Sequence, residues 1–330
     1  MPDSNYAYIS GKIRALEPLV LAETDIERMV DAPDFDSAFK VLNDTDYANN
    51  LLDVDPFNYR DALRNDFKGL YKLLSGVPDK LLTKILYLDR DFLNIRYLFK
   101  AKYFGLTLEG RVVTETNYNF EDLKRFIMEG KGLGLDPEIQ TVLKNVDKKF
   151  SKTPKDPSAL DSYLTNQYFQ MMLNLGKEFN NSFVLGWIQK QINNANVLTF
   201  LRGKRLGLTA DRISKKFVAG GKISEKDLRK HYLDDGGDIK SLISKHYDNA
   251  VKESYANYLE SGILFQFEKA LEDHITRFMR SAKYITFGPE VIVSYFVSKT
   301  VAVKNVRLIM TGKLNGVPAE AIKNTLREVY

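Results

Sequence analysis

Apolar residues recur every three to four positions along almost the whole chain, which is the spacing of amphipathic helices. Tyr8, Ile9, Ile13 and Leu16 form the first such stripe, and Pro18 follows it as a helix-ending residue. The same spacing marks further helical segments at residues 25–30, 35–42, 56–74, from 78 onward, 160–206, 246–283 and 288–312. Two short extended pieces, near 111–113 and 285–287, are strand candidates without an obvious partner. The pattern therefore predicts an all-α protein.

A twelve-residue motif occurs three times within this helical pattern. It reads NIRYLFKAKYFG at 94–105, NVLTFLRGKRLG at 196–207 and NVRLIMTGKLNG at 305–316. Each copy begins with Asn, has a small residue at the eighth place and Lys at the ninth, and ends with Gly. Apolar positions upstream of the first two copies also match at a constant shift: Phe67 with Phe169, Leu70 with Met172, and Ile85 with Trp187.

The motif has a physical interpretation as a helix end. Its Asn, small residue, Lys and Gly share one helix face because their offsets follow the helical period. Gly would end the helix in the left-handed conformation, and Lys would complement the helix dipole and the free carbonyls of that end. An acid follows each copy, at Glu109, Asp211 and Glu320, where a second helix would begin. Each copy is therefore predicted to be a corner between two helices.

The spacing of the copies predicts a triplicated unit of about one hundred residues. We place the three helical units at 1–115, 116–220 and 221–330, arranged with three-fold pseudo-symmetry around a central pit. The alternative is that unrelated helix pairs share similar ends, because Gly and Lys are common there. Residues 148–157 and 234–238 are polar and read as loops between packed elements.

Composition and charge narrow the class of protein. The 330 residues are 44% hydrophobic and 28% charged, with no cysteine and a net charge of +5, which is typical of a folded globular chain. Residues 1–60 carry twelve acids and five bases, whereas residues 202–222 carry seven bases and one acid. This polarity indicates a charged partner at one end of the chain, although solvated helix faces would also produce it. The start of the chain has no signal-peptide pattern, and the apolar stretch 291–297 is too short to span a membrane.

No catalytic, cofactor or metal site is evident in the sequence. His231, His246 and His274 have no ligand at metal-binding spacing. The glycine-containing stretches 130–134 and 220–222 lack the features of phosphate loops, and 234–238 lacks the glutamate of a calcium loop. We therefore expect a protein without enzymatic activity, cofactor or metal. The basic segment 202–222 contains one aromatic residue, Phe217, which makes an acidic protein a better match for it than a nucleic acid.

Three stretches resemble the C subunit of V/A-type rotary ATPases, the relative of the eukaryotic d subunit. They are 6–17 (YAYISGKIRALE), 42–47 (LNDTDY) and 89–105 (DRDFLNIRYLFKAKYFG), the last with its Asp91, Asn94 and Arg96 core. The resemblance extends over essentially the whole chain. The middle repeat departs from the others because Leu198 stands where they have Arg, which implies that the three units are not equivalent at their contact surfaces.

The resemblance implies a three-lobed helical funnel that couples a central shaft to a membrane rotor ring. Its partners would be the D and F subunits of the shaft and the c/K ring, for proton or sodium transport linked to ATP hydrolysis or synthesis. The protein would lie at the cytoplasmic face of the membrane and touch it only through the ring. The alternatives are a free-standing helical adaptor and a nucleic-acid-binding protein that uses residues 202–222.

Thirteen residues are predicted to line the cavity or bind a partner. The asparagines would hold helix contacts, the lysines would cap their own helix ends, and the remaining bases would face acidic partner groups. The residues are Asn94, Arg96, Lys102, Asn196, Arg202, Lys204, Arg205, Arg212, Lys215, Lys216, Asn305, Arg307 and Lys313.

Overall fold

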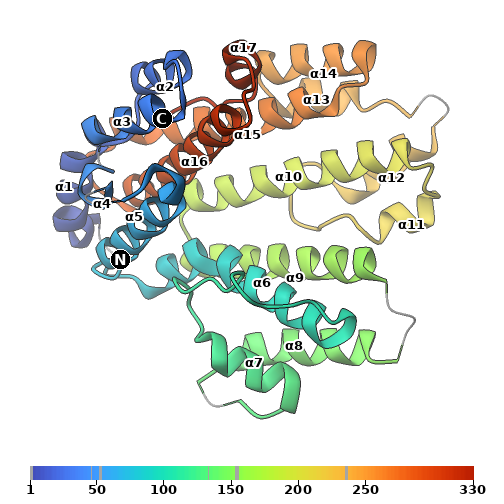
Figure 1. Ribbon diagram of the computed structural model, residues 1–330. Helices are drawn as coiled ribbons and strands as arrows, with labels where there is room; N and C mark the ends of the chain where they lie inside the picture. Colours follow the sequence, from blue (N-terminus) through green and yellow to red (C-terminus); the bar gives the residue numbers. More distant parts are fainter. Residues whose placement is uncertain (1–2, 46, 52–53, 133, 153–155, 235–236) are drawn as a thin grey trace. The chain divides into compact units, whose positions relative to one another are not determined.

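The computed structural model describes residues 3–45, 47–51, 54–132, 134–152, 156–234 and 237–330 (Figure 1). Within these ranges every regular element is an α- or 3-10 helix, so the all-α prediction is confirmed. The chain forms two compact units, one from residues 80–237 and one from residues 1–79 together with 238–330. We call them the middle unit and the terminal unit. The predicted division into three units stays a prediction.

The middle unit begins with the longest of its helices, which carries the first motif. Its helices are α6 (Lys80–Phe104), α7 (Phe120–Glu129), α8 (Pro137–Phe150), α9 (Pro157–Phe179), α10 (Ser182–Arg205), α11 (Ala210–Ser214) and α12 (Glu225–Leu233). Helix α9 packs against both α6 and α10, and the shorter α7 and α8 pack against α6 and α9 respectively (Figure 1).

The terminal unit combines the two ends of the chain. Its α-helices are α1 (Ala7–Leu16), α2 (Glu23–Asp31), α3 (Phe35–Val41), α4 (Ala48–Leu51), α5 (Tyr59–Leu74), α13 (Lys240–His246), α14 (Asn249–Ser261), α15 (Leu264–Arg280), α16 (Pro289–Leu314) and α17 (Ala319–Lys323). Its 3-10 helices are η1 (Asp3–Tyr6), η2 (Glu17–Leu19), η3 (Leu42–Asp44), η4 (Pro56–Asn58) and η5 (Ser281–Tyr284). One apolar core joins α2, α3 and α5 to the face of α16 that contains Val306, Ile309 and Met310.

The ends of the helices follow the local sequence. The side chains of Asp136, Asn181, Ser224 and Asp248 each accept a hydrogen bond from a backbone N–H in the first turn that follows. Such a cap stabilises a helix by about 1 kcal/mol. Pro137 and Pro157 stand at the first helical position, where a missing N–H costs nothing.

The glycines that close the three motifs all have the predicted left-handed conformation. Their φ angles are 69° at Gly105, 61° at Gly207 and 64° at Gly316. The second and third motifs continue into the short helices α11 and α17, which begin beside Asp211 and Glu320 as expected. The first motif differs, because no helix follows Gly105 until α7. The prediction of a two-helix corner is therefore wrong for the first copy.

The remaining local predictions have mixed outcomes. The pieces at 111–113 and 285–287 are not strands, since neither finds a neighbouring strand with which to pair. The segments 160–206 and 246–283 are each interrupted, at Asn180 with φ 55° and at Gly262 with φ 70°. Residues 46, 133, 153–155 and 235–236 lie outside the described part of the chain, so the predicted loops at 148–157 and 234–238 and the stretches 130–134 and 42–47 are described only in part.

Candidate functional site

The asparagine of each motif binds the backbone of a single residue downstream. Asn94 Nδ2 donates to Val113 O at 2.8 Å, and Val113 N donates back to Asn94 Oδ1 at 3.0 Å. Asn196 makes the same pair of bonds with Val218, both at 2.8 Å. Asn305 makes them with Arg327, both at 2.9 Å.

These asparagines are structural anchors inside the protein. All three are 0% exposed, so they neither line an open cavity nor touch a partner. The segment that each one holds is irregular rather than helical, which corrects the expectation that they hold helix contacts. An extended segment has backbone groups that no helix satisfies, and a primary amide offers one donor and one acceptor that match them.

The lysine of each motif donates to a carbonyl at the end of a different helix. Lys102 Nζ donates to Ile127 O of α7 at 2.6 Å, and Lys204 Nζ donates to Tyr232 O of α12 at 2.8 Å. Lys313 Nζ donates to the backbone oxygen of Ala32, the residue that directly follows α2 as its C-cap. The lysines therefore cap another helix and not their own, which corrects the prediction. The reason is that the motif's own last carbonyls are already bonded by the amides around its left-handed glycine, as in Gly207 N to Lys204 O at 3.0 Å.

The small residue of the motif allows a close approach in two of the three copies. A Cβ added to Gly203 would lie 2.4 Å from Ile213 Cδ1, and one added to Gly312 would lie 2.6 Å from Ile322 Cδ1. Both isoleucines stand ten positions after their glycine, on α11 and α17. The first copy has Ala101 in this position and lacks the following helix.

Arg96 and Arg307 differ in their surroundings. Arg96 Nη2 donates to Thr165 Oγ1 at 3.1 Å, and its Nε lies 3.3 Å from Asp161 Oδ1, so it joins α6 to α9. Arg307 is exposed on α16. The Arg96 side chain is 32% exposed and serves helix packing, whereas Arg307 is the more exposed of the two.

Four exposed bases lie in the second motif and in or directly after α11. Arg202, Arg205, Arg212 and Lys215 are exposed, and we call these four residues the basic corner. Leu206 lies among them with 72% of its surface exposed. Lys216 is half-buried and donates to Ser162 Oγ at 2.7 Å, so it serves packing within the unit. A cationic surface with one exposed leucine suits an acidic protein partner.

Two residues near the motif, Asp91 and Asn193, were not among the thirteen predicted site residues. Asp91 accepts hydrogen bonds from Asn117 N at 2.9 Å, from Asn117 Nδ2 at 2.6 Å and from Tyr118 N at 3.2 Å. Burial raises the pKa of Asp91 to about 7, against the opposing effect of these bonds. Asn193 holds Ile223 N in a similar way at 3.1 Å. Both stand three places before a motif asparagine, so the shift of 102 residues between the first two copies was the available signal.

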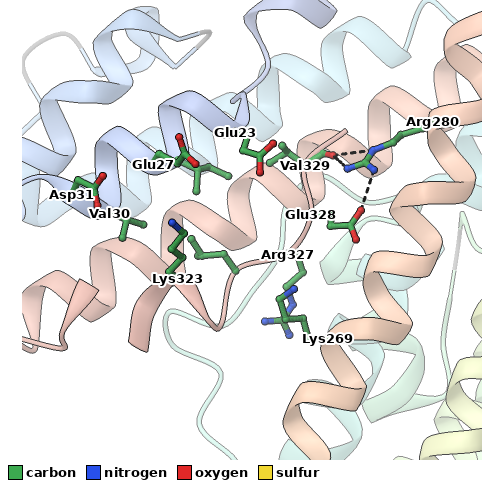
Figure 2. Close-up of a pocket in the computed structure, with 12 residues that line it drawn as sticks. Glu23, Glu27, Val30, Asp31, Lys269, Arg280, Lys323, Arg327, Glu328 and Val329 are labelled. Atoms are coloured by element: carbon green, nitrogen blue, oxygen red, sulfur yellow. Dashed lines mark hydrogen bonds and ion pairs between the residues drawn. The ribbon is translucent and has the colours of Figure 1, made fainter. Parts of the chain in front are cut away.

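The terminal unit contains a small cavity of about 200 Å³ between α2, α15 and residues 323–329. Figure 2 shows Glu23, Glu27 and Asp31 on α2 and the bases Lys269, Arg280, Lys323 and Arg327 across from them. The α2 side is acidic and the other side combines these bases with Glu328, and nothing in this arrangement resembles a nucleophile with its base.

Metal-binding and membrane-spanning features are missing from the described ranges of the chain. No group of three or more potential metal ligands occurs among those residues. No helix placed there has the length and apolar character needed to cross a bilayer. His274 is buried and lies 2.8 Å from Asp248 Oδ2, in a contact that packs α15 against the start of α14.

Comparison with known proteins matches most of the chain to one family. Residues 9–325 match the family described as ATP synthase (C/AC39) subunit. The C subunit of the A-type ATP synthase of Methanocaldococcus jannaschii is 27% identical over 97% of this chain and 86% of its own length. The C subunit of the V-type sodium ATPase of Enterococcus hirae is 22% identical over 98% of this chain and 99% of its own.

Proposed function

Because the chain belongs to the ATP synthase (C/AC39) subunit family, we propose that it is a non-catalytic part of a rotary ATPase that joins a central shaft to a membrane rotor ring. The shaft would consist of the D and F subunits, and the ring of c/K subunits. The protein would lie at the cytoplasmic face of the membrane and pass torque between the two for proton or sodium transport. The match over residues 9–325 is the observation that carries this proposal.

The interior of the protein fits a part that transmits force. Each motif helix is tied to its neighbours by a fully buried asparagine and by a lysine that caps a second helix. Two hydrogen bonds to one residue fix both its position and its orientation, which limits local bending. Three such ties with the same geometry support the triplicated design with units near 1–115, 116–220 and 221–330.

The basic corner is the surface that we assign to an acidic partner on the shaft or the ring. Its four side chains are exposed and belong to α10 and α11 or directly follow α11. Exposed charges of this kind set association rate and specificity more than affinity. Arg307 is a second exposed base of the motif helices and a weaker candidate for the same role.

Charge reversal tests this assignment. The triple variant Arg205→Glu, Arg212→Glu, Lys215→Glu is compared with the wild type for binding to a purified D–F shaft complex and to a detergent-solubilised ring. We expect binding to one of them to weaken at least about tenfold, with a flatter dependence on salt. The control Lys68→Glu, Lys72→Glu changes exposed bases of α5 and should bind like the wild type.

Two results would count against the proposal. Unchanged binding of the triple variant to both partners would show that the basic corner does not bind either of them. Failure of the wild-type chain to bind either partner would remove the coupling role itself. In that case a nucleic-acid filter-binding series across salt concentrations tests the alternative, which predicts a steep decline of affinity with salt.

A further inference from the structure

In two motifs the lysine contacts a helix that comes later in the sequence, and in the third motif it contacts a helix that comes earlier. Lys102 of α6 caps α7, the next full helix, and Lys204 of α10 caps α12 in the same way. Lys313 of α16 caps α2, which lies 281 residues earlier in the sequence. Helix α2 therefore occupies the position that a following helix occupies in the other two cases.

The correspondence extends to the residues just before the capped helices. Leu21, Tyr118 and Ile223 each stand two places before the helix and are 2%, 6% and 2% exposed. Tyr118 and Ile223 come five residues after the valine held by the motif asparagine. In the third case the held residue is Arg327 and the buried residue before the capped helix is Leu21, although no short peptide connects the two. Tyr330 and Pro18 line one hollow, so the two stretches of chain lie near each other.

We propose that this third junction is a non-covalent seam, and that residues 325–330, which we call the strap, act as a latch that opens locally while the other two junctions stay closed. At those junctions the peptide chain itself joins the held residue to the capped helix. At the seam, the strap and α2 can separate without breaking a bond. Local opening of this kind requires much less free energy than global unfolding.

Ion pairs hold the charged side chains of the strap, while Leu326 packs in the apolar core. Arg327 Nε lies 2.7 Å from Glu272 Oε2, and Glu328 pairs with Arg277 and, at 3.0 Å, with Arg280. Arg280 Nη2 also donates to Val329 O at 2.6 Å (Figure 2). The side chains of Arg280 and Glu328 are 40% and 33% exposed, whereas that of Arg327 is 6% exposed, so salt weakens chiefly the pairs of Glu328.

The second junction is the matched comparison because its contacts are neutral. Asn196 holds Val218, Asn193 holds Ile223, and Gln170 donates to Ala219 O at 3.1 Å. In both junctions two backbone amides bond to buried side-chain oxygens. They are Val218 and Ile223 at the second junction, and Arg327 and Glu328 at the seam, where Asp273 Oδ1 accepts from Glu328 N at 2.8 Å.

Hydrogen exchange at single-residue resolution on the full chain tests the latch. Under native conditions the amides of Arg327 and Glu328 should exchange at least about tenfold faster than those of Val218 and Ile223. Raising sodium chloride from about 0.05 M to about 0.5 M should widen the difference, because it shortens the screening length. Equal protection at both junctions, or exchange of the strap only through global unfolding, would overturn the proposal.

A single substitution separates the latch from general stability. Glu328→Gln keeps the size of the side chain but removes the charge that faces Arg277 and Arg280. We expect several-fold faster exchange at Arg327 and Glu328, no change at Val218, and less sensitivity to salt. Glu260→Gln, at an exposed position of α14, is the control. Exchange of the strap in Glu328→Gln that matches the control would show that the ion pairs do not hold it.

Discussion

Lys299 of α16 and Asp66 of α5 form an ion pair inside the terminal unit. Lys299 Nζ lies 2.7 Å from Asp66 Oδ1, and the two side chains are 2% and 9% exposed. The same ammonium group lies 4.5 Å from the centre of the Tyr47 ring. The pair joins helices from the two ends of the chain, which places an ionic contact within their common packing.

Removal of one partner of this pair should be strongly destabilising. Lys299→Met leaves the Asp66 carboxylate buried without its counter-charge, and we expect a loss of about 3–5 kcal/mol in the free energy of unfolding. Urea denaturation measures it. Lys304→Met on the same helix breaks a half-exposed pair with Glu272 and should cost less than about 1 kcal/mol. Similar losses in the two variants would contradict the assignment.

The buried asparagines should contribute more to the stability of the fold than their helix propensity predicts. Asn196→Ala leaves the N–H and C=O of Val218 without their partner, which should cost about 2–4 kcal/mol. Asn257→Ala changes an exposed asparagine of α14 and should be neutral or slightly stabilising, because alanine favours helices. A thermal or urea denaturation series compares them. A loss below about 1 kcal/mol for Asn196→Ala would mean that water satisfies Val218.

Two glycine substitutions in helices should have opposite signs. In Gly203→Ala the new Cβ would lie 2.4 Å from Ile213 Cδ1, and we expect a net loss of about 1–2 kcal/mol from overpacking. In Gly69→Ala the Cβ meets nothing within 4 Å, so the helix should gain about 0.5–1 kcal/mol. Chemical denaturation of both variants decides the matter, and a gain for Gly203→Ala would show that α11 moves aside freely.

Asp91 should make the stability of the middle unit depend on pH. Its pKa is raised by burial to about 7 in the folded state, above its ordinary value near 4. The folded state therefore binds the extra proton between these values, and its stability falls as pH rises from about 4 to about 7. Asp91→Asn removes this effect, so its free energy of unfolding should improve relative to the wild type across that range, by at most about 1.4 kcal/mol per pH unit. Parallel stability curves from about pH 4 to about pH 8 would refute the shift.

The helices and the repeated motif could be predicted from the sequence because both depend on local periodicity and on glycine. The φ angles of Gly105, Gly207 and Gly316 match the prediction. The contacts made by the motif could not be predicted in the same way. The chain gives no sign that Lys313 reaches Ala32, since their meeting depends on how distant helices pack. The sequence also could not show that no helix directly follows Gly105, because Glu109 stands at the same place after its motif as Asp211 and Glu320.

The sequence showed where basic residues are concentrated, but it did not show which of their side chains are exposed. The basic segment 202–222 does yield an exposed corner, yet Lys204 and Lys216 within it bond to groups of the same unit. Likewise Arg96 belongs to helix packing. Sequence alone cannot distinguish a base that meets solvent from one that meets a neighbouring helix, because both lie on polar helix faces.

The amide of each motif asparagine bonds only to the backbone N–H and C=O of its target, so the side chain of the held residue is free to differ. Valine fills the place twice and arginine once, with the same pair of bonds. A tie of this kind places almost no demand on the identity of the residue it holds. The three motifs can thus differ at the held residue while the same pair of hydrogen bonds is kept.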